Sequence, residues 1–139
     1  MGNYEVGITV IMPVYKVEKY VAKAIECVLN QTFKDFEVVL INDGSPDNSQ
    51  FIIEEFCRAD KRFKCYVQEN GGVAAARNNG IMKAQGDYLV FYDPDDFIPK
   101  DALKSMYKAA KKNNADLVYC DYYEYYGDNN LKLVTNSFI

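Results

Sequence analysis

The sequence predicts an α/β protein whose central sheet is mainly parallel and carries helices on both faces. Short apolar runs of strand length, rich in Val, Ile, Phe and Tyr, alternate with segments whose apolar residues recur at helical spacing. Polar loops that contain Gly or Pro follow several of the apolar runs. Regular alternation of strands and helices is typical of βα units, which build parallel sheets covered on both sides.

The expected strands are the apolar runs, which lie at Ile8–Met12, Phe36–Ile41, Phe63–Val67, Tyr88–Tyr92 and Leu117–Tyr123. The first expected helix has its apolar residues at Val21, Ala24, Ile25, Val28 and Leu29, and the second at Ile52, Ile53, Phe56 and Cys57. A third helix, made of small residues, is expected after Gly71 and Gly72. The apolar residues of the tail Gly127–Ile139 have no companion element after them, so we expect the chain to be incomplete.

The bulk composition predicts one compact domain and excludes several classes of function. A chain of 139 residues, 49% of them hydrophobic, can bury one core. The formal net charge of −4 argues against a nucleic-acid partner, because phosphate binding requires clustered Lys and Arg. The absence of His excludes His-based catalytic triads and His-rich zinc sites.

Cysteine usage indicates the cellular setting. Cys27, Cys57, Cys65 and Cys120 form no CxxC pair and lie within apolar stretches, as reduced core cysteines do. This favours a cytoplasmic setting, with the inner membrane surface as an alternative. The polar first residues, and the lack of an apolar run of about 20 residues, predict neither a signal peptide nor a transmembrane helix in this chain.

Asp43 is the first candidate ligand-binding residue. It directly follows the second expected strand, where its carboxylate can accept hydrogen bonds from a ligand and Gly44 lets that ligand approach the backbone. The alternative is that Asp43 caps the following turn or helix. The residues by themselves leave both interpretations open.

An acidic cluster follows the fourth expected strand. Asp93, Asp95 and Asp96 lie within four residues, and carboxylates this close repel one another unless a cation is present. Oxygen ligands without His or Cys suit Mg²⁺ or Mn²⁺, which commonly also bind phosphate oxygens of a substrate. The alternative is a solvated turn that caps a helix before Pro99.

The segment from Gly71 to Gly80 is predicted to be a glycine turn that enters a helix. The two glycines at its start allow close approach of a phosphate or ribose. Arg77 lies about one turn into this helix, from which it can reach a nucleotide or pair with Asp43 or Asp95. The segment lacks the Gly-Lys-Ser/Thr of a Walker phosphate loop.

Taken in order, the motifs resemble those of the family 2 glycosyltransferases across residues 8 to about 125. They are Pro13-Val14-Tyr15, Gln31-Thr32-Phe33, Asn42-Asp43-Gly44-Ser45, Ala76-Arg77-Asn78-Asn79-Gly80, Gly86-Asp87-Tyr88, and Asp93-Pro94-Asp95-Asp96 followed by Pro99. The resemblance implies a GT-A fold, a nucleotide-diphosphate sugar donor such as a UDP-sugar, and Mn²⁺ or Mg²⁺ as cofactor. It further implies inverting transfer to a saccharide or lipid-linked acceptor in polysaccharide or glycoconjugate synthesis.

The same resemblance implies roles for individual residues. By position, Pro13 and Tyr15 would flank the nucleobase, Asp43 would bind its edge and Arg77 would contact the nucleotide. Asp93 would face the ribose or sugar, while Asp95 together with Asp96 would hold the metal. Residues 1–139 would then form a single donor-binding domain without the acceptor side.

The sequence also departs from the family pattern. Lys16 stands where Asn often follows the tyrosine, and it adds a positive charge. The family's general base lies further downstream, so we expect it beyond Ile139 and expect this chain alone to bind donor but to transfer little. The alternative function is a non-catalytic nucleotide-sugar-binding module. A phosphorylated receiver-type domain is disfavoured because Met12-Pro13-Val14 lacks the paired acids of that class.

Overall fold

The computed structural model describes residues 6–135, and the chain divides into two compact units between Lys104 and Ser105. The first unit contains the whole parallel sheet, whereas the second contains most of one helix and a small hairpin.

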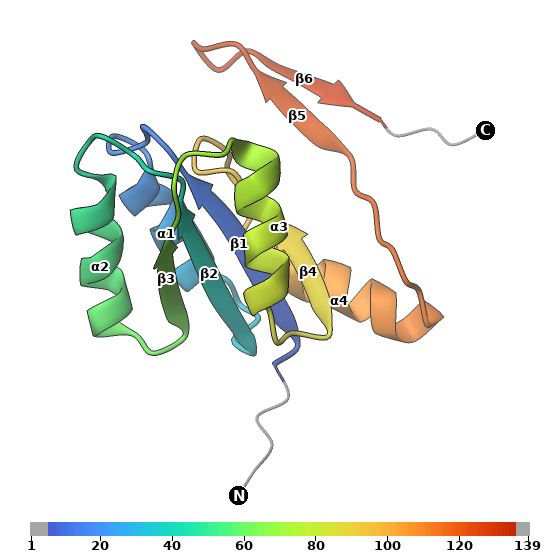
Figure 1. Cartoon of the computed structure of the whole chain (residues 1–139). Coiled ribbons are helices and arrows are strands. Elements are labelled where there is room, and N and C mark those ends of the chain that lie inside the picture. Colours follow the sequence, from blue (N-terminus) through green and yellow to red (C-terminus); the bar gives the residue numbers. More distant parts are fainter. Residues whose placement is uncertain (1–5, 136–139) are drawn as a thin grey trace, which may run out of the picture. The chain divides into compact units, whose positions relative to one another are not determined.

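The first unit is built on a four-stranded parallel sheet with the order β3-β2-β1-β4 (Figure 1). Its strands are β1 (Ile8–Val14), β2 (Phe36–Asn42), β3 (Phe63–Val67) and β4 (Tyr88–Phe91). Ile8 of β1 lies opposite Phe36 on one side and Tyr88 on the other. Every residue of β1 and β2 is buried, which explains why these two strands are almost continuously apolar in sequence.

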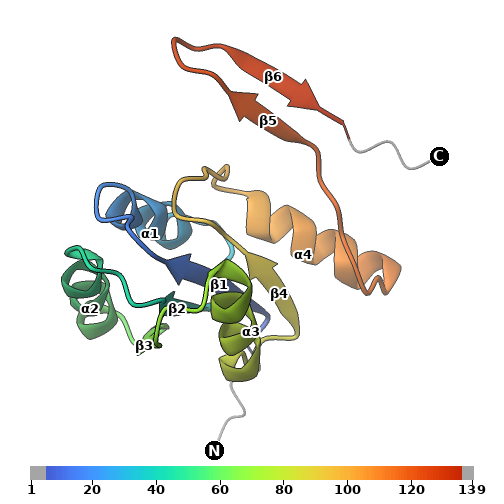
Figure 2. The same cartoon turned by 45° about the horizontal axis from the view of Figure 1, so that its top comes forward.

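Helices cover both faces of this sheet, as the sequence predicted (Figures 1 and 2). Helices α1 (Val21–Leu29) and α2 (Ser49–Ala59) lie on one face, and α3 (Val73–Lys83) lies on the other. Helix α3 approaches the sheet closely at Gly80, where an added Cβ would lie 2.4 Å from Cγ2 of Ile11. Packing against β1 therefore requires a glycine at position 80.

Gln31 ties the end of α1 to the loop after β4. Its buried side-chain amide donates to the carbonyl oxygen of Pro99 at 2.8 Å and accepts from the backbone N–H of Leu103 at 3.1 Å. Leu103 lies in the first turn of α4 (Ala102–Asn113) and is itself buried. The acidic loop between β4 and α4 is thus anchored at its far end by a satisfied buried amide.

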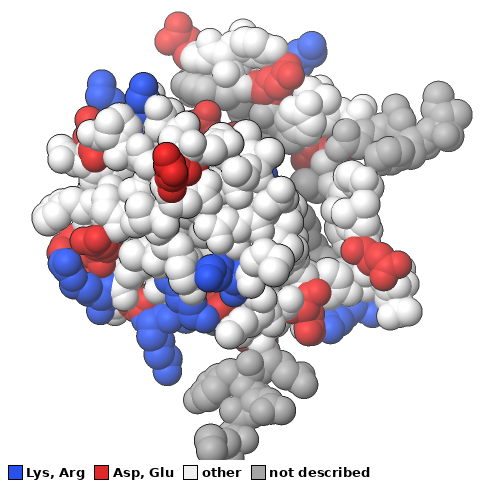
Figure 3. All heavy atoms as spheres, in the orientation of Figure 1, with Lys and Arg blue, Asp and Glu red and all other residues white. Residues whose placement is uncertain are grey.

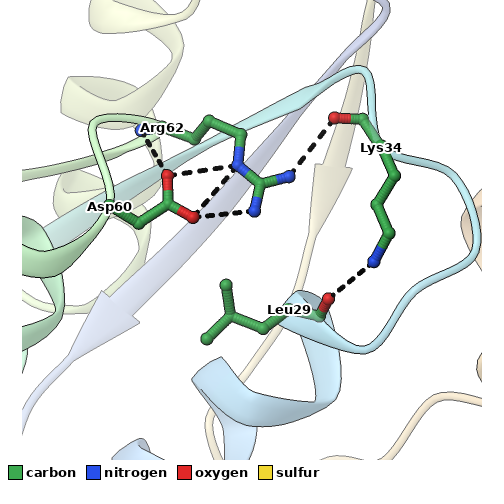
Figure 4. Close-up of polar contacts among 4 residues, drawn as sticks. All are labelled: Leu29, Lys34, Asp60 and Arg62. Carbon is green, nitrogen blue, oxygen red and sulfur yellow. Dashed lines mark hydrogen bonds and ion pairs between the residues drawn. The ribbon is translucent and has the colours of Figure 1, made fainter.

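At the opposite edge of the sheet, where the strands begin, charges are paired with one another. Arg62 donates from Nη2 to Oδ2 of Asp60 at 2.7 Å and from Nη1 to the carbonyl oxygen of Lys34 at 3.4 Å (Figure 4). Buried Glu37 accepts from Nζ of Lys64 at 2.8 Å. Figure 3 shows Lys and Arg side chains gathered over this lower end of the unit.

The second unit contains the rest of α4 and an antiparallel hairpin of β5 (Tyr122–Tyr125) and β6 (Leu131–Val134), with Tyr122 opposite Val134. The prediction of a strand at Leu117–Tyr123 in the parallel sheet is wrong, because residues 117–121 have no regular structure and β5 pairs only within the hairpin. The tail prediction is also corrected in part, because β6 has β5 as its partner. Phe138 and Ile139 lie outside the described residues.

Two further sequence predictions concern the environment of the chain. The four cysteines are free, but none is a core residue: three are partly buried and Cys120 is exposed. Among residues 6–135, no helix has both the length and the apolar character needed to cross a membrane.

Candidate nucleotide-binding site

A pocket of about 520 Å³ lies at the carboxyl edge of the parallel sheet. It brings together five of the predicted site residues, which are Pro13, Tyr15, Asp43, Asp93 and Asp95. The other lining residues are Lys16, Val17, Tyr20, Asn70, Gly72, Val73 and Pro94. Arg77 and Asp96 do not line the pocket, but each is next to a residue that does: Arg77 pairs with Asp93, and Asp96 follows Asp95 in the chain. Parallel strands bring their carboxyl ends to one edge, so loops distant in sequence meet there.

Asp43 forms the buried end of this pocket, with 3% of its surface exposed. Its Oδ1 accepts hydrogen bonds from Gln68 Nε2 and the Gly71 N–H, both at 2.8 Å. Its Oδ2 accepts from the Gly72 N–H at 2.9 Å and from Asn70 Nδ2 at 3.3 Å. Asp43 therefore binds the loop before α3, and the alternative that it caps the turn after β2 is not what the structure shows.

The hydrogen bonds explain the acidity of Asp43. Burial is the largest single influence and would raise the pKa of this carboxyl group. The bonds from Gly71, Gln68 and Gly72 together outweigh burial and hold its pKa below the usual value. Asp43 is thus a stable anion before any ligand arrives.

The sequence did not indicate the role of Gln68 and Asn70. Gln68 is fixed in turn by Asn79, whose Nδ2 donates to its Oε1 at 2.9 Å. The Asn70 amide makes a second bond of 2.9 Å to the backbone carbonyl of Asp43. The Asn-Gly-Gly turn was visible in sequence, but the direction of these two amides depends on the path of the loop.

The loop after β1 is clamped to the loop after β2. The Lys16 N–H donates to Ser45 Oγ at 2.7 Å, and that hydroxyl donates to Asp47 Oδ1 at 2.6 Å. Asp47 also accepts from the Glu18 N–H at 3.1 Å. Burial opposes ionisation of Asp47, yet the bonds from the serines and from Glu18 lower its pKa to about 2. These hydrogen bonds hold the loop after β1 and the loop after β2 together beside Tyr15.

The acidic loop after β4 holds three carboxylates close together. One oxygen each from Asp93, Asp95 and Asp96 lie within 4.8 Å of one another. Tyr92 stabilises this turn by donating from its hydroxyl to the carbonyl oxygen of Asp96 at 2.7 Å. Burial, followed by the charges of Asp95 and Asp93, raises the pKa of Asp96 above its usual value.

Arg77 pairs with Asp93, and not with Asp43 or Asp95 as the sequence alternatives proposed. Its Nη2 lies 3.0 Å and 3.1 Å from the two carboxylate oxygens of Asp93. The guanidinium also faces the ring of Phe91, with 5.9 Å from its central carbon to the ring centroid. This pairing compensates one of the three charges and leaves Asp95 and Asp96 without a cationic partner among the described ion pairs.

The remaining donor set fits a hard divalent cation. Asp95 and Asp96 are exposed, offer only carboxylate oxygens, and carry charges that repel one another. Mg²⁺ and Mn²⁺ are typically bound through one or two carboxylates together with phosphate oxygens and water. These residues would hold such an ion at the open side of the pocket.

The chain is similar to several known proteins. The model of glycosyl transferase family 2 matches residues 9–137. Glycosyltransferase GlyA of Streptococcus pneumoniae serotype 4 is 42% identical over 118 residues, which cover 85% of this chain and 17% of that protein. The structure of S. aureus TarS in complex with UDP aligns with a TM-score of 0.74 and 30% identity, covering 79% of this chain and 33% of that one.

A more distant structure shares the same fold. The mannosyltransferase PcManGT from Pyrobaculum calidifontis, crystallised with GDP-Man and Mn²⁺, aligns with a TM-score of 0.71 at 23% identity and covers 78% of this chain and 33% of that one. The expected GT-A architecture is therefore confirmed. The chain spans a third or less of the length of these three proteins.

Proposed function

Because the chain belongs to glycosyl transferase family 2, we propose that its pocket binds a UDP-sugar and a divalent cation for inverting transfer to an acceptor hydroxyl. One observation carries this proposal: Asp43, Asp93 and Asp95, from the ends of two strands, converge on a single pocket. The TarS structures contain UDP or UDP-GlcNAc, which supports the choice of uridine nucleotide.

In this proposal Asp43 and Asn70 bind the edge of the nucleobase. The acceptor positions of the Asp43 carboxylate are filled by four donors, so a base N–H must replace one of them. The Asn70 contact is the longest at 3.3 Å, and Asn70 keeps its 2.9 Å bond to the Asp43 carbonyl if it yields. Asn70 is therefore the donor that exchanges, while Pro13 and Tyr15 flank the base.

The other end of the pocket binds the diphosphate and sugar. Asp95 and Asp96 hold the cation, which would stabilise the negative charge of the departing nucleoside diphosphate. Asp93, oriented by Arg77, faces the ribose or sugar. None of these carboxylates is assigned as the general base, because each is committed to a cation, to Arg77 or to the loop before α3.

The proposal extends to the acceptor and the cellular setting. A saccharide or lipid-linked saccharide is proposed as acceptor, in polysaccharide or glycoconjugate synthesis. The four free cysteines support a cytoplasmic setting.

Isothermal titration of UDP with and without Mn²⁺ tests this function. We expect the wild type to bind UDP more tightly with Mn²⁺, and Asp95→Ala to lose most of that gain because a carboxylate ligand is missing. Asp116→Ala is the matched control, since Asp116 is also an exposed aspartate but lies outside the pocket. Equal metal dependence in wild type and Asp95→Ala would remove Asp95 from the cation site, and absence of UDP binding would refute the proposed function.

A further inference from the structure

Lys16 has an unusual backbone conformation for its residue type. Among residues 6–135, four non-glycine residues have positive φ, and three of them are Asn or Asp, which tolerate this region: Asn114, Asp128 and Asn129. The fourth is Lys16, with φ of 54°. A lysine in this conformation stores strain, and strain at a pocket wall points to a functional constraint.

The surrounding structure holds Lys16 in place. Its N–H donates to Ser45 Oγ at 2.7 Å, in the loop that begins with Asp43. Glu18 and Asp47 clamp the same two loops through the bond from the Glu18 N–H to Asp47 Oδ2. The strained backbone of Lys16 is therefore held by Ser45, which is itself hydrogen-bonded to Asp47.

The side chain of Lys16 contacts Tyr15, its neighbour in the lining of the nucleotide pocket. Its Nζ lies over the ring of Tyr15, 5.3 Å from the centroid. Lys16 lines the nucleotide pocket and also a neighbouring pocket of about 400 Å³. No carboxylate among residues 6–135 forms an ion pair with this ammonium group.

We infer that Lys16 is a specificity-determining residue whose ammonium group donates a hydrogen bond to a carbonyl oxygen of the nucleobase. The inference rests on the proposed function and adds a contact to it. The ammonium group of Lys16 faces the ring of Tyr15, which is proposed to flank the base, and the Lys16 backbone is held by Ser45, whereas the proposed cation site follows β4. In uracil, the N–H that would donate a hydrogen bond to Asp43 lies between two carbonyl groups. One of these carbonyl oxygens would accept a hydrogen bond from the ammonium group of Lys16.

Three substitutions separate the charge of Lys16 from its strain. Lys16→Met keeps the strained backbone and removes the charge, Lys16→Asn removes the charge and relieves the strain, and Lys16→Arg keeps the charge. Lys19→Met is the matched control, because Lys19 is an exposed lysine of the neighbouring pocket that does not line the nucleotide pocket. Binding is measured for UDP by calorimetry and for uridine by NMR titration.

We expect Lys16→Met and Lys16→Asn to weaken UDP and uridine binding by the same factor, roughly fivefold, as an exposed charge-assisted hydrogen bond would. Lys16→Arg and Lys19→Met should bind like the wild type. Lys16→Asn should also melt at a higher temperature than Lys16→Met, because Asn tolerates positive φ.

Several outcomes overturn the inference while leaving the proposed function intact. If the loss appears for UDP but not for uridine, the ammonium group binds phosphate and not the base. If wild type binds UDP but gives no uridine response at millimolar concentration, or if Lys16→Met binds both ligands like wild type, Lys16 does not determine base recognition. Failure of wild type to bind UDP at all would instead refute the proposed function.

Discussion

Asp43 and the Asp93–Asp96 loop both follow strands at the same edge of the sheet, yet the surroundings of their carboxylates shift the pKa values of Asp43 and Asp96 in opposite directions. Asp43 is buried and receives hydrogen bonds from four donors, so its pKa is lowered. Asp95 and Asp96 are exposed and crowded, and the pKa of Asp96 is raised. The protein stabilises the charge of Asp43 with hydrogen bonds, whereas Asp95 and Asp96 have no cationic partner among the described ion pairs, and we propose that a divalent cation binds there.

This difference distinguishes a carboxylate that holds the fold together, Asp43, from the carboxylates proposed to bind a ligand, Asp95 and Asp96. Buried carboxylates elsewhere follow the Asp43 pattern, since Glu37 is bonded to Lys64, Thr9 and the Gln85 N–H. Burying a charge without partners is costly, so compensation is expected there. Only an exposed loop can keep its repulsion at modest cost, and that repulsion favours binding of a divalent ion.

The largest expected effect is on stability after Asp43→Ala. Removal of this carboxylate leaves the N–H groups of Gly71 and Gly72 and the Gln68 amide without their acceptor. We expect the free energy of unfolding to fall by about 2–3 kcal/mol, and UDP affinity to fall as the loop loosens. Urea denaturation measures the first effect, with Asp96→Ala as control. Similar losses in both variants would show that the two regions do not differ as described.

The second prediction concerns Mn²⁺ without nucleotide. At ten times its dissociation constant, an ion that binds only the folded state stabilises it by about 1.4 kcal/mol. Thermal melts should show this gain in wild type and in Lys19→Met, but not in Asp95→Ala. A gain that persists in Asp95→Ala would place the cation elsewhere.

The third prediction concerns Arg77→Met. Loss of its half-exposed pair with Asp93 should cost about 0.5–1 kcal/mol of stability. The uncompensated Asp93 should then bind Mn²⁺ more tightly, while UDP affinity falls because Arg77 no longer orients Asp93. Arg58→Met is the control, since Arg58 pairs with Glu54 and Glu55 on an exposed helix face. Unchanged Mn²⁺ affinity in Arg77→Met would show that the pair does not set the charge of the loop.

The parallel sheet was predictable because its strands are buried on both faces. Such strands are continuous apolar runs, and β1 and β2 show this in every residue. The same rule failed at Leu117–Tyr123, where tyrosines and valine resemble a buried strand but Leu117, Tyr119 and Tyr123 are exposed. Sequence composition does not say which apolar run finds a neighbouring strand.

The sequence indicated several residues that line the candidate site, but not the hydrogen bonds and ion pairs that they make. Clustered acids after strands indicated Asp43, Asp93 and Asp95, and the pocket contains all three. The partner of Arg77 depended on how α3 faces β4, and the donors to Asp43 depended on the path of the loop before α3. Neither is encoded in a local motif.

The smallest expected effect is that of Asp96→Asn on stability. Its pH dependence should be opposite in direction to that of the contribution from Asp43. A carboxyl group whose folded pKa is raised binds its proton more readily in the folded state, so its ionisation costs stability as the pH rises through that pKa. The variant should therefore exceed wild type by up to about 0.5 kcal/mol at pH 7 without metal. The advantage should vanish as the pH falls from the raised pKa toward 3.8, the ordinary pKa of an aspartate side chain. The pH dependence of the Asp43 contribution is opposite, because its lowered pKa contributes stability above the ordinary pKa of 3.8, and that stability is lost as the pH falls through the folded pKa. Urea titrations from pH 3 to pH 7 measure both slopes, and saturating Mn²⁺ should reverse the order of wild type and Asp96→Asn at neutral pH. An advantage of Asp96→Asn that grows as the pH falls would mean that its origin is not repulsion among the three carboxylates.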